Sequence, residues 1–466
     1  MAEQNLAEQN LRGIAVVDVG YTNSKVILYD RHLQVLGERK LPSPHHQGQH
    51  YGEIDVLAIM AFAKAALAEL DAILPVDRIV PCAHGACIIS LKQDGSLAVP
   101  AMDYMSEPPA EILAAYTAMA PDIAESFSPQ LPLALLHAMQ LFLQSRILPE
   151  DFAQNTSIMP LMQYVAFALG GRRATEVSSI SCQSHLIDMR NGGPSALANT
   201  EGWAEKFSPM AKAWEVIGKF NGKLRGDGHV LAGVHDSNAN FLRYLASGEH
   251  HFTLLSTGTW IIGFDTKADV SHLDPARDIV ANKSVFGKTI ACGRFFGGKE
   301  FELVAGDATQ ATPTLAAVRH LVVTGIMALP SFTDTGGPMP GTAARGRIIG
   351  TLSSAEECVS LASLYCALMV SETLDALHSQ HTIIVDGPFS QNPVFLQILA
   401  SLRTAQQLKA SLARDGTAAG AACLALMPDG QPPVMPVAMH DIAAVNIPGL
   451  KAYQAMWQKT VRANTA

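Results

Sequence analysis

The chain has few charged residues and no cluster of basic ones. Charged side chains make up 16% of its 466 residues, and 33 Lys and Arg stand against 42 Asp and Glu, so the formal net charge is −9. A nucleic-acid binder needs a basic patch to meet the phosphate backbone, so we expect no nucleic-acid partner. With 48% hydrophobic residues the chain can fill more than one buried core, which excludes a disordered protein.

Cysteine is sparse and irregularly placed. The seven cysteines are odd in number and never form a C-x-x-C pair, which excludes both a disulfide framework and a cysteine zinc site. The N-terminal segment MAEQNLAEQNLR is polar and lacks the apolar region of a signal peptide. Lys64 interrupts the apolar stretch Ile54–Leu70, and the stretch around Met159–Leu169 is too short to span a bilayer. We therefore expect a cytoplasmic protein without a membrane partner.

Several familiar site motifs are also missing. No G-x-G-x-x-G follows the first predicted strand, which argues against a dinucleotide oxidoreductase. The sequence FGKT ends like a phosphate-binding loop, but Asn282 stands where its first glycine is required. His45, His46 and His50 lack the H-E-x-x-H spacing of a zinc site, so we interpret them as solvated loop histidines.

The sequence contains two similar strand–turn–strand segments, one in each half. Gly13–Asp18 and Lys25–Tyr29 flank the first turn, and Phe252–Phe264 contains the second. The repeat is typical of duplicated domains, so we expect two, residues 1–245 and 246–466. No low-complexity linker separates the halves, so we expect them to be held rigidly around a cleft. Further strands are predicted at Arg78–Cys82, Cys87–Leu91 and Thr382–Asp386, and helices at Ile54–Leu70, Leu131–Gln144, Pro160–Leu169, Trp203–Lys219, Ala355–Ser379 and Asp415–Met427.

Both turns have the composition of an anion site. Asp18–Lys25 reads DVGYTNSK and Ser256–Trp260 reads STGTW, and a hairpin turn with glycine and hydroxyl side chains offers backbone N–H groups to phosphate. An Asp at the end of the first strand can hold Mg²⁺ near phosphates. The alternative is that each is an ordinary polar turn.

Asp236, in the segment GVHDSNAN, stands between the two turns in the sequence. One interpretation is that it caps the helix that follows. The other is that it acts as a general base, taking the proton from a hydroxyl that attacks a phosphoryl group. Because phosphate-type turns flank it, we favour the second interpretation.

These segments together resemble the FGGY family of carbohydrate kinases, within the actin-like ATPase superfamily. DVGYTNSK is similar to the first phosphate motif, STGTW to the second and GVHDSNAN to the catalytic-base segment. VDGPFSQNP resembles the adenosine motif, DGTAAGAACLA the helix near the nucleotide, and AHGA the sugar-contacting loop. The segments GVHD, STGTW and SCQS resemble the rhamnulokinase- and fuculokinase-like branch.

The resemblance implies an α/β fold of two ribonuclease-H-like (actin-like ATPase) domains around a central cleft. The N-terminal domain would bind the sugar and carry the first phosphate motif, and the C-terminal domain would bind the nucleotide. It implies ATP and Mg²⁺ as cofactors, Asp236 as the base and Asp18 near the metal. The implied nucleotide contacts are Thr22, Asn23, Lys25, Thr257, Gly258, Thr259, Gly387, Ser390, Gln391, Asn392, Gly416 and Gly420, and the implied sugar contacts are His84, Asp103, Gln183 and His235.

The chain departs from the family pattern at four places, one of which is the absence of the usual Lys-Trp-rich signature around Pro129–Leu141. Tyr21 follows the glycine of the first motif where many relatives have Thr. Pro388 interrupts the adenosine loop, removing an N–H and fixing φ. Met102–Glu107 replaces the common Trp-x-Asp-x-Arg sugar segment. Separately, Gly293–Glu300 predicts a turn that enters a helix and is a further site candidate.

We therefore expect a transferase that moves the γ-phosphoryl group of ATP to a hydroxyl of a ketose or deoxy-ketose. The alternative is a sugar or nucleotide sensor with the same fold that consumes no ATP. The sequence leaves open whether the chain forms a homodimer.

Overall fold

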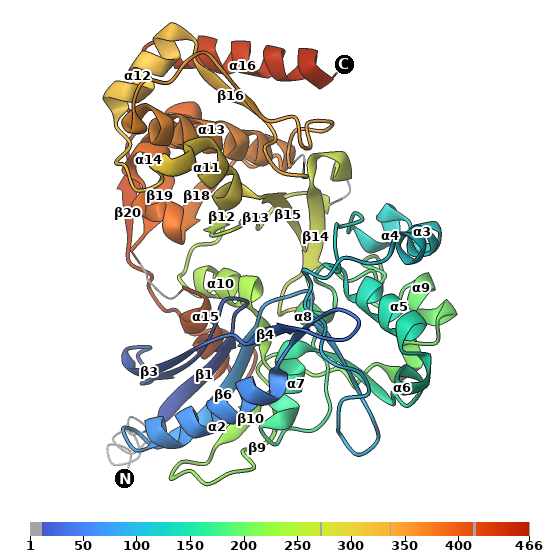
Figure 1. The fold of residues 1–466 in the computed structure, drawn as a ribbon. Coiled ribbons are helices and arrows are strands. Elements are labelled where there is room, and N and C mark those ends of the chain that lie inside the picture. Colours follow the sequence, from blue (N-terminus) through green and yellow to red (C-terminus); the bar gives the residue numbers. More distant parts are fainter. Residues whose placement is uncertain (1–11, 271–272, 336, 413–415, 466) are drawn as a thin grey trace. The chain divides into compact units, whose positions relative to one another are not determined.

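The computed structural model describes residues 12–270, 273–335, 337–412 and 416–465, which form two compact units (Figure 1). Unit 1 contains residues 1–248, 282–289 and 415–435, and unit 2 contains residues 249–281, 290–414 and 436–466. Most of the polar N-terminal segment, and Asp415 at the start of a predicted helix, lie outside the described residues.

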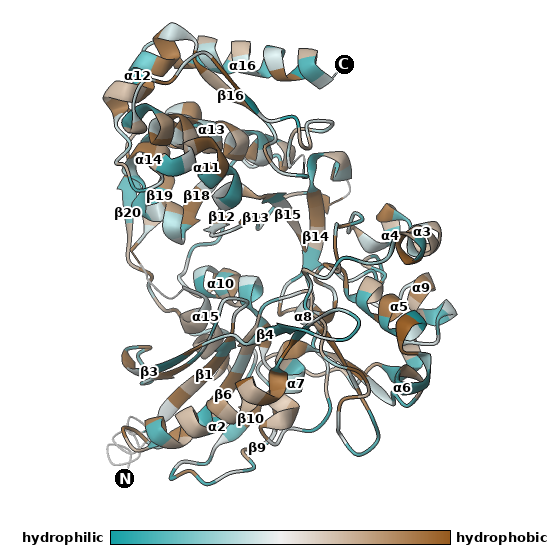
Figure 2. Cartoon of the chain, in the orientation of Figure 1, coloured by the Kyte–Doolittle hydropathy of each residue, from teal (hydrophilic) through white to brown (hydrophobic). Residues whose placement is uncertain are grey.

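Unit 1 is built on a mixed sheet with the strand order β3-β2-β1-β6-β10-β9, in which β11 also pairs with β6. Hairpins make the β3-β2-β1 side antiparallel, whereas β10 and β11 run parallel to β6, as β1 does. Alternate residues of β1 face opposite layers: Ala15 and Val17 pack in a core with α2 and α7, and Ile14 and Val16 pack in a core with α10 and α15. Figure 2 shows the resulting hydrophobic strands.

The strands and helices of unit 1 have the following bounds. The strands are β1 Gly13–Val19, β2 Asn23–Tyr29, β3 Val35–Pro42, β4 His45–Gln47, β5 Gly52–Ile54, β6 Val76–Ala83, β7 Ile88–Leu91, β8 Ser157–Pro160, β9 Val216–Lys219, β10 His229–Leu231 and β11 Val234–His235. The helices are α2 Val56–Asp71, α3 Ala110–Met119, α4 Ile123–Ser126, α5 His137–Ile147, α6 Pro149–Ala153, α7 Leu161–Ala168, α8 Val177–Ile180, α9 Ala196–Thr200, α10 Asp236–Leu245 and α15 Gly416–Leu424.

Unit 2 has a second sheet with the order β14-β15-β13-β12-β18-β19-β20. One face, which includes Leu255 of β12 and Val385 of β18, packs with α13 in the largest hydrophobic core. Among the described helices, α13 is the one long and apolar enough to cross a membrane by length and composition. However, 89% of its apolar window is buried inside the protein, as expected for a core helix.

The elements of unit 2 complete the described structure. The strands are β12 Phe252–Thr257, β13 Ile261–Asp265, β14 Ile279–Lys283, β15 Thr289–Phe295, β16 Met327–Leu329, β17 Arg347–Ile349, β18 Thr382–Asp386, β19 Leu408–Ser411 and β20 Met439–Ile442. The helices are α11 Gly297–Ala305, α12 Leu315–Thr324, α13 Ala355–Ala376, α14 Pro393–Leu402 and α16 Leu450–Thr465.

Most predicted elements are present, but the helix predicted at Trp203–Lys219 is wrong. One short 3₁₀ turn, Ala204–Lys206, lies there, and the segment ends in strand β9. Pro209 removes an N–H that a helix would need, while its carbonyl accepts from the Thr175 amide. Tertiary pairing therefore overrides the helical periodicity of this segment.

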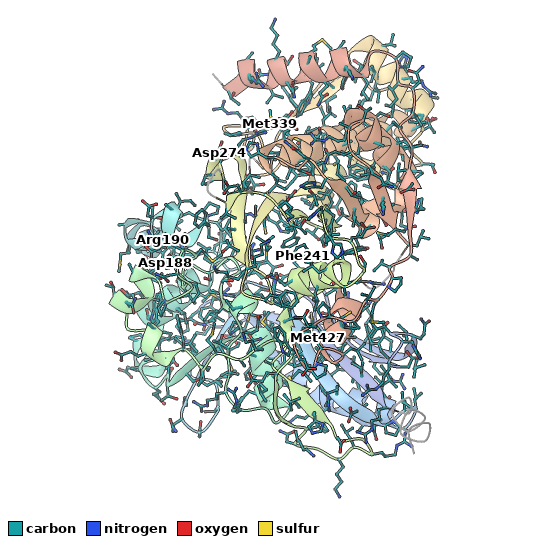
Figure 3. The ribbon with its side chains drawn as sticks, turned by 180° about the vertical axis from the view of Figure 1, so that it is seen from behind. Asp188, Arg190, Phe241, Asp274, Met339 and Met427 are labelled. Atoms are coloured by element: carbon teal, nitrogen blue, oxygen red, sulfur yellow. The ribbon has the colours of Figure 1, made fainter. Side chains whose placement is uncertain are left out.

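The predicted domain boundary near residue 245 and the structural units differ in detail. Residues 282–289 and 415–435 belong to unit 1, although both segments lie in the second half of the sequence. The boundary between functional domains stays a prediction. The loop that follows the SCQS segment also belongs to unit 1, and there Asp188 and Arg190 form an ion pair of 2.7 Å (Figure 3).

Candidate active site

Three chemically important residues of unit 1 lie at the carboxyl ends of neighbouring parallel strands. Asp18 lies near the end of β1, His84 directly follows β6, and Asp236 directly follows β11. Cys82 of β6 pairs with Asp18 on one side and with Val234 on the other. Burial and the nearby carboxylates of Asp18 and Asp236 raise the pKa of the Cys82 thiol. Both carboxylates therefore lie at one edge of the sheet, where α/β proteins commonly bind ligands.

Asp236 has one fixed and one available carboxylate oxygen. Its Oδ1 accepts hydrogen bonds from the Ser237 amide at 2.6 Å and the Ser237 hydroxyl at 3.3 Å, and lies 3.1 Å from His235 Nε2. Among the described residues, none donates a hydrogen bond to Oδ2. The side chain is 33% exposed. A carboxylate held through one oxygen and open at the other can accept a proton from a bound hydroxyl.

His235 is buried directly beside this carboxylate. Its Nε2 also lies 3.7 Å from the Cys182 sulfur. Burial by itself lowers the pKa of His235, but Cys182 and Asp236 outweigh it and raise that pKa to about 9. A Cβ on Gly85 would lie 2.8 Å from His235 Nε2, so the glycine leaves space for this ring. His235 therefore packs against the Oδ1 side of the Asp236 carboxylate.

His84 and Gln183 lie near the same glycine. The Nδ1 of His84 is 2.6 Å from the Gly85 carbonyl, so this nitrogen carries the proton and donates it. Burial lowers the pKa of His84. The neutral ring then keeps Nε2 as an acceptor for a hydroxyl. A Cβ on Gly85 would also lie 3.5 Å from Gln183 Oε1, which places the amide close to His84.

Asp103 is held in a polar and aromatic cluster formed by Tyr21, His45, Asp103 and Tyr104, hereafter the Tyr21 cluster. The Tyr21 hydroxyl donates to Asp103 Oδ2 at 3.2 Å, and His45 Nδ1 lies 2.8 Å from the same oxygen. The Tyr21 ring centroid is 4.6 Å from that of Tyr104. Burial, and then Tyr21, Asp103 and Asp236, raise the pKa of Tyr104, so this ring lies near both carboxylates. His45 is thus a partner of Asp103, and its interpretation as a solvated loop residue was wrong.

A polar pocket of about 520 Å³ borders this cluster. It is lined by His45, His46, Gln47, His50, Tyr51, Gly52, Asp103, Met105, Ser106 and Glu107. His46 and His50 are exposed, as expected for solvated residues, but His46 lies in strand β4, so its interpretation as a loop residue was wrong.

The first turn is closed by its own backbone. The Gly20 amide donates to the Asn23 carbonyl at 3.0 Å, and the Ser43 hydroxyl donates to the Gly20 carbonyl at 2.7 Å. Thr22 is exposed, and Lys25 lies opposite Asp18 in the register of β1 and β2. The Gly20 amide is therefore engaged within the turn, so it is not available to an anion in this conformation.

In unit 2 the second turn contacts the loop that follows β18. The Thr257 hydroxyl donates to the Asp386 carbonyl at 2.5 Å and accepts from the Phe389 amide at 3.1 Å. Gly387 has a φ of 87°, and a Cβ there would lie 2.0 Å from the Thr257 carbonyl oxygen. Pro388 begins a 3₁₀ turn, Pro388–Gln391. The loop thus accommodates the proline by folding tightly against the end of β12.

A pocket of about 520 Å³ lies beside this contact. It is lined by Gly258, Thr259, Gly298, Lys299, Phe301, Glu302, Thr309, Pro388, Phe389 and Asn392. The rings of Phe301 and Phe389 meet edge to face with centroids 5.7 Å apart. A Cβ on Gly298 would lie 2.3 Å from the Gly258 carbonyl oxygen, so the start of α11 packs closely on the turn. The backbone N–H groups of a glycine turn can bind phosphate, and apolar rings beside it can pack against a flat base.

The predicted nucleotide residues of the adenosine loop fall into two groups. Asn392 lines the pocket and also caps α14 by accepting from the Phe395 amide at 3.0 Å. Ser390 is buried and Gln391 is exposed, and neither lines the pocket.

Gly416 and Gly420 lie in α15 of unit 1. A Cβ on Gly420 would lie 1.9 Å from the Ala239 carbonyl oxygen, so helix packing accounts for this glycine.

Sequence reasoning missed residues whose partners are distant in the chain. Tyr21 was noted as a departure from a motif, not as a partner of Asp103. Lys299 lies within the segment Gly293–Glu300 and Phe301 follows it directly. That segment was a site candidate to which no role was assigned. Cys182 lies within SCQS, but its contact with His235 joins positions 53 residues apart. No local pattern carries that information.

Comparison with known proteins identifies the family. The sequence model of "Carbohydrate kinase FGGY, C-terminal domain" matches residues 249–433. A carbohydrate kinase from Novosphingobium aromaticivorans has a similar crystal structure, with 31% identity, a TM-score of 0.86 and coverage of 97% of this chain and 99% of that one. A search of curated proteins finds no match.

More distant structures share the fold. Gluconate kinase from Lactobacillus acidophilus is 15% identical, with a TM-score of 0.82 and coverage of 98% of both chains. Plasmodium falciparum glycerol kinase with ADP is also 15% identical, with a TM-score of 0.81 and coverage of 97% of this chain and 98% of that one.

These findings support an enzyme over a sensor and confirm the mixed α/β, two-domain fold with actin-like ATPase architecture. ATP-dependent phosphorylation of a sugar follows from the family. The chain belongs to the FGGY family of carbohydrate kinases.

Proposed function

We propose that the enzyme phosphorylates a hydroxyl of a ketose or deoxy-ketose, with Asp236 as the general base. The observation that carries the proposal is the geometry of Asp236, whose Oδ1 is held by Ser237 and His235 while Oδ2 receives no hydrogen bond from the described residues. The substrate class rests on the resemblance of GVHD, STGTW and SCQS to the rhamnulokinase- and fuculokinase-like branch.

On the sugar side, we assign His84, Gln183 and Asp103 to hydroxyl recognition. His84 offers Nε2 as an acceptor, because its Nδ1 proton is directed at the Gly85 carbonyl. Gln183 can both donate and accept. Asp103 already accepts from Tyr21 and from the Met105 amide, so it orients the cluster as well as offering a carboxylate. Such a set favours a polyhydroxylated acceptor.

On the nucleotide side, we assign the unit 2 pocket to adenosine and the Gly258–Thr259 turn to phosphate. Phe301, Phe389 and Pro388 supply apolar contacts for a base, and the contact of Thr257 with the Phe389 amide fixes the loop. Thr22, Asn23 and Lys25 in unit 1 stay proposed phosphate contacts. The nucleotide roles of Gly387, Ser390, Gln391, Gly416 and Gly420 also remain proposals, as does cytoplasmic location.

Asp18 fits a magnesium role by its chemistry. It is a partly buried carboxylate at the strand edge that also holds Asp236, and carboxylate oxygens suit Mg²⁺. Bound Mg²⁺ would neutralise charge on the phosphates of ATP. Asp18 would hold the ion there, directly or through water.

The test of function is release of ADP from ATP in the presence of four- to six-carbon ketoses and polyols. We expect rapid release with one or a few ketoses and slow release without an acceptor. Binding of sugar and ATP without ADP release would instead support the sensor. Selective turnover of non-ketose polyols would contradict the substrate class.

The test of the base is Asp236→Asn. Because general-base assistance contributes about 10²–10⁴-fold, we expect kcat to fall by that order while ATP binding changes little. The same substitution at the exposed Asp151 serves as the control and should leave kcat unchanged. An Asp236→Asn enzyme with near-normal kcat would remove the assignment.

A further inference from the structure

His45 connects two segments of unit 1 that are far apart in the sequence. Its Nε2 lies 2.8 Å from the backbone carbonyl oxygen of Tyr21, in the turn that follows β1. Its Nδ1 lies 2.8 Å from Asp103 Oδ2, in the segment that replaces the usual sugar motif. His45 itself begins β4, which pairs with β5. The ring therefore bridges the proposed phosphate turn and the proposed sugar segment.

Both partners of this ring are acceptors. A carbonyl oxygen can only accept, so Nε2 must carry a proton. Asp103 accepts the Met105 amide at 2.9 Å on Oδ1 and the Tyr21 hydroxyl at 3.2 Å on Oδ2. Burial and Asp103 raise the pKa of Tyr21 to about 12, so this hydroxyl keeps its proton and donates. An unprotonated Nδ1 would then point a lone pair at a carboxylate oxygen 2.8 Å away.

The surroundings of His45 contain one strong anion and few cations. Asp103 faces it from the segment between β7 and α3. The neutral ring of Tyr21 lies against His45 with centroids 4.5 Å apart, and the ring of Tyr104 lies against Tyr21. His84, after β6, is close enough to interact electrostatically with His45, but burial keeps its pKa low. His50 and Glu107 line the same pocket, and Glu53 of β5 is 3.2 Å from the neighbouring His46. Asp103 is thus the anion that His45 contacts directly.

We propose that His45 acts as a doubly protonated positioning residue that ties Asp103 to the backbone of the Asp18–Lys25 turn. It holds the proposed sugar carboxylate at a fixed distance from the proposed phosphate turn. The role in catalysis rests on the proposed function, whereas the protonation of the ring follows from its hydrogen bonds.

The first experiment measures the protonation of His45 directly. Nitrogen-15 NMR of the full chain labelled at histidine distinguishes doubly from singly protonated rings, and His45→Gln identifies the His45 signals by their loss. We expect both ring nitrogens to be protonated at pH 6. A ring with one protonated nitrogen at that pH would overturn the proposal, whether or not a substrate is known.

The second experiment measures the role of the bridge in turnover. Using the acceptor found by ADP release, we expect His45→Gln to raise the sugar KM about tenfold, as for loss of one charge-assisted hydrogen bond, with a smaller change in kcat. The control is His32→Gln, because His32 is an exposed turn residue of the same unit and lines no pocket of the site. It should behave like the parent enzyme. A normal sugar KM for His45→Gln would overturn the positioning role.

Asp103→Asn tests whether the Asp103 carboxylate keeps the proton on His45 Nδ1. An amide nitrogen at this position can donate to an unprotonated Nδ1, so the neutral ring fits the variant. At the same near-neutral pH, nitrogen-15 NMR should show a doubly protonated His45 ring in the parent and a singly protonated one in Asp103→Asn. The same protonation in both proteins would overturn the proposal. If no acceptor releases ADP, the proposed function fails, and the NMR result still decides the protonation.

Discussion

At the scale of single residues, buried His137 has a strongly shifted pKa, although it is not among the proposed sugar contacts. It begins α5 and is 1% exposed. Burial, with smaller contributions from His235 and His84, lowers its pKa to about 3. The unfolded chain binds a proton at this residue below about pH 6.5, whereas the folded chain does so near pH 3. The folded state therefore loses stability as the pH falls between these two values.

This difference gives a prediction for His137→Leu. Between pH 7 and pH 4.5, the free energy of unfolding of the parent should fall by about 2.5 kcal/mol more than that of the variant. Denaturant unfolding at both pH values measures the difference. The same change at exposed His50 should leave the pH dependence as it is. Equal pH dependence in the parent and His137→Leu would contradict a buried neutral ring.

Gly387 gives a second prediction at this scale. Gly387→Ala would place a Cβ 2.0 Å from the Thr257 carbonyl oxygen in a residue with φ of 87°. Gly287→Ala is the matched control, since its φ is 75° but nothing lies within 4 Å of the new Cβ. Because positive φ alone costs roughly 1 kcal/mol, we expect Gly287→Ala to cost about that and Gly387→Ala at least about 3 kcal/mol. Thermal unfolding compares the two, and equal losses would show that the close contact is relieved easily.

At the scale of elements, the contact between α10 and α15 explains why a helix of small residues follows residue 415. Gly420 lies within α15, and a Cβ there would lie 1.9 Å from the Ala239 carbonyl oxygen of α10. Both helices pack on the same face of the unit 1 sheet. Asp236 is the first residue of α10, so this contact also supports the proposed base.

Gly420→Ala separates helix propensity from helix packing. Propensity alone predicts that the alanine stabilises a helix by about 1 kcal/mol. Close packing predicts the opposite sign, because backbone atoms must move apart. We expect a lower melting temperature and, because α10 shifts, a lower kcat. A higher melting temperature would mean that α15 moves away without cost.

At the scale of the whole molecule, the proposed reaction requires ATP, a sugar and Mg²⁺ together. Removing divalent ions with EDTA should reduce ADP release by at least about 100-fold, because the phosphate charge is then not neutralised. Adding Mg²⁺ in excess should restore it. Asp18→Asn should raise the Mg²⁺ concentration needed for half-maximal turnover. Full activity in EDTA would contradict the metal prediction.

The oligomeric state is a further property of the whole molecule, and the homodimer stays an open alternative. Light scattering of the purified chain measures it directly.

The local sequence determined the strands, most helices and the order of the motifs, because alternating apolar residues, glycine turns and caps act between near neighbours. It also singled out Asp18, His84, Gln183 and Asp236. Tertiary structure decided the rest. His45 meets Asp103 across 58 residues and Cys182 meets His235 across 53, and such contacts depend on strand order and loop closure, which no local pattern encodes. For the same reason Trp203–Lys219, helical by periodicity, became a turn and a strand once Val216–Lys219 paired with β10.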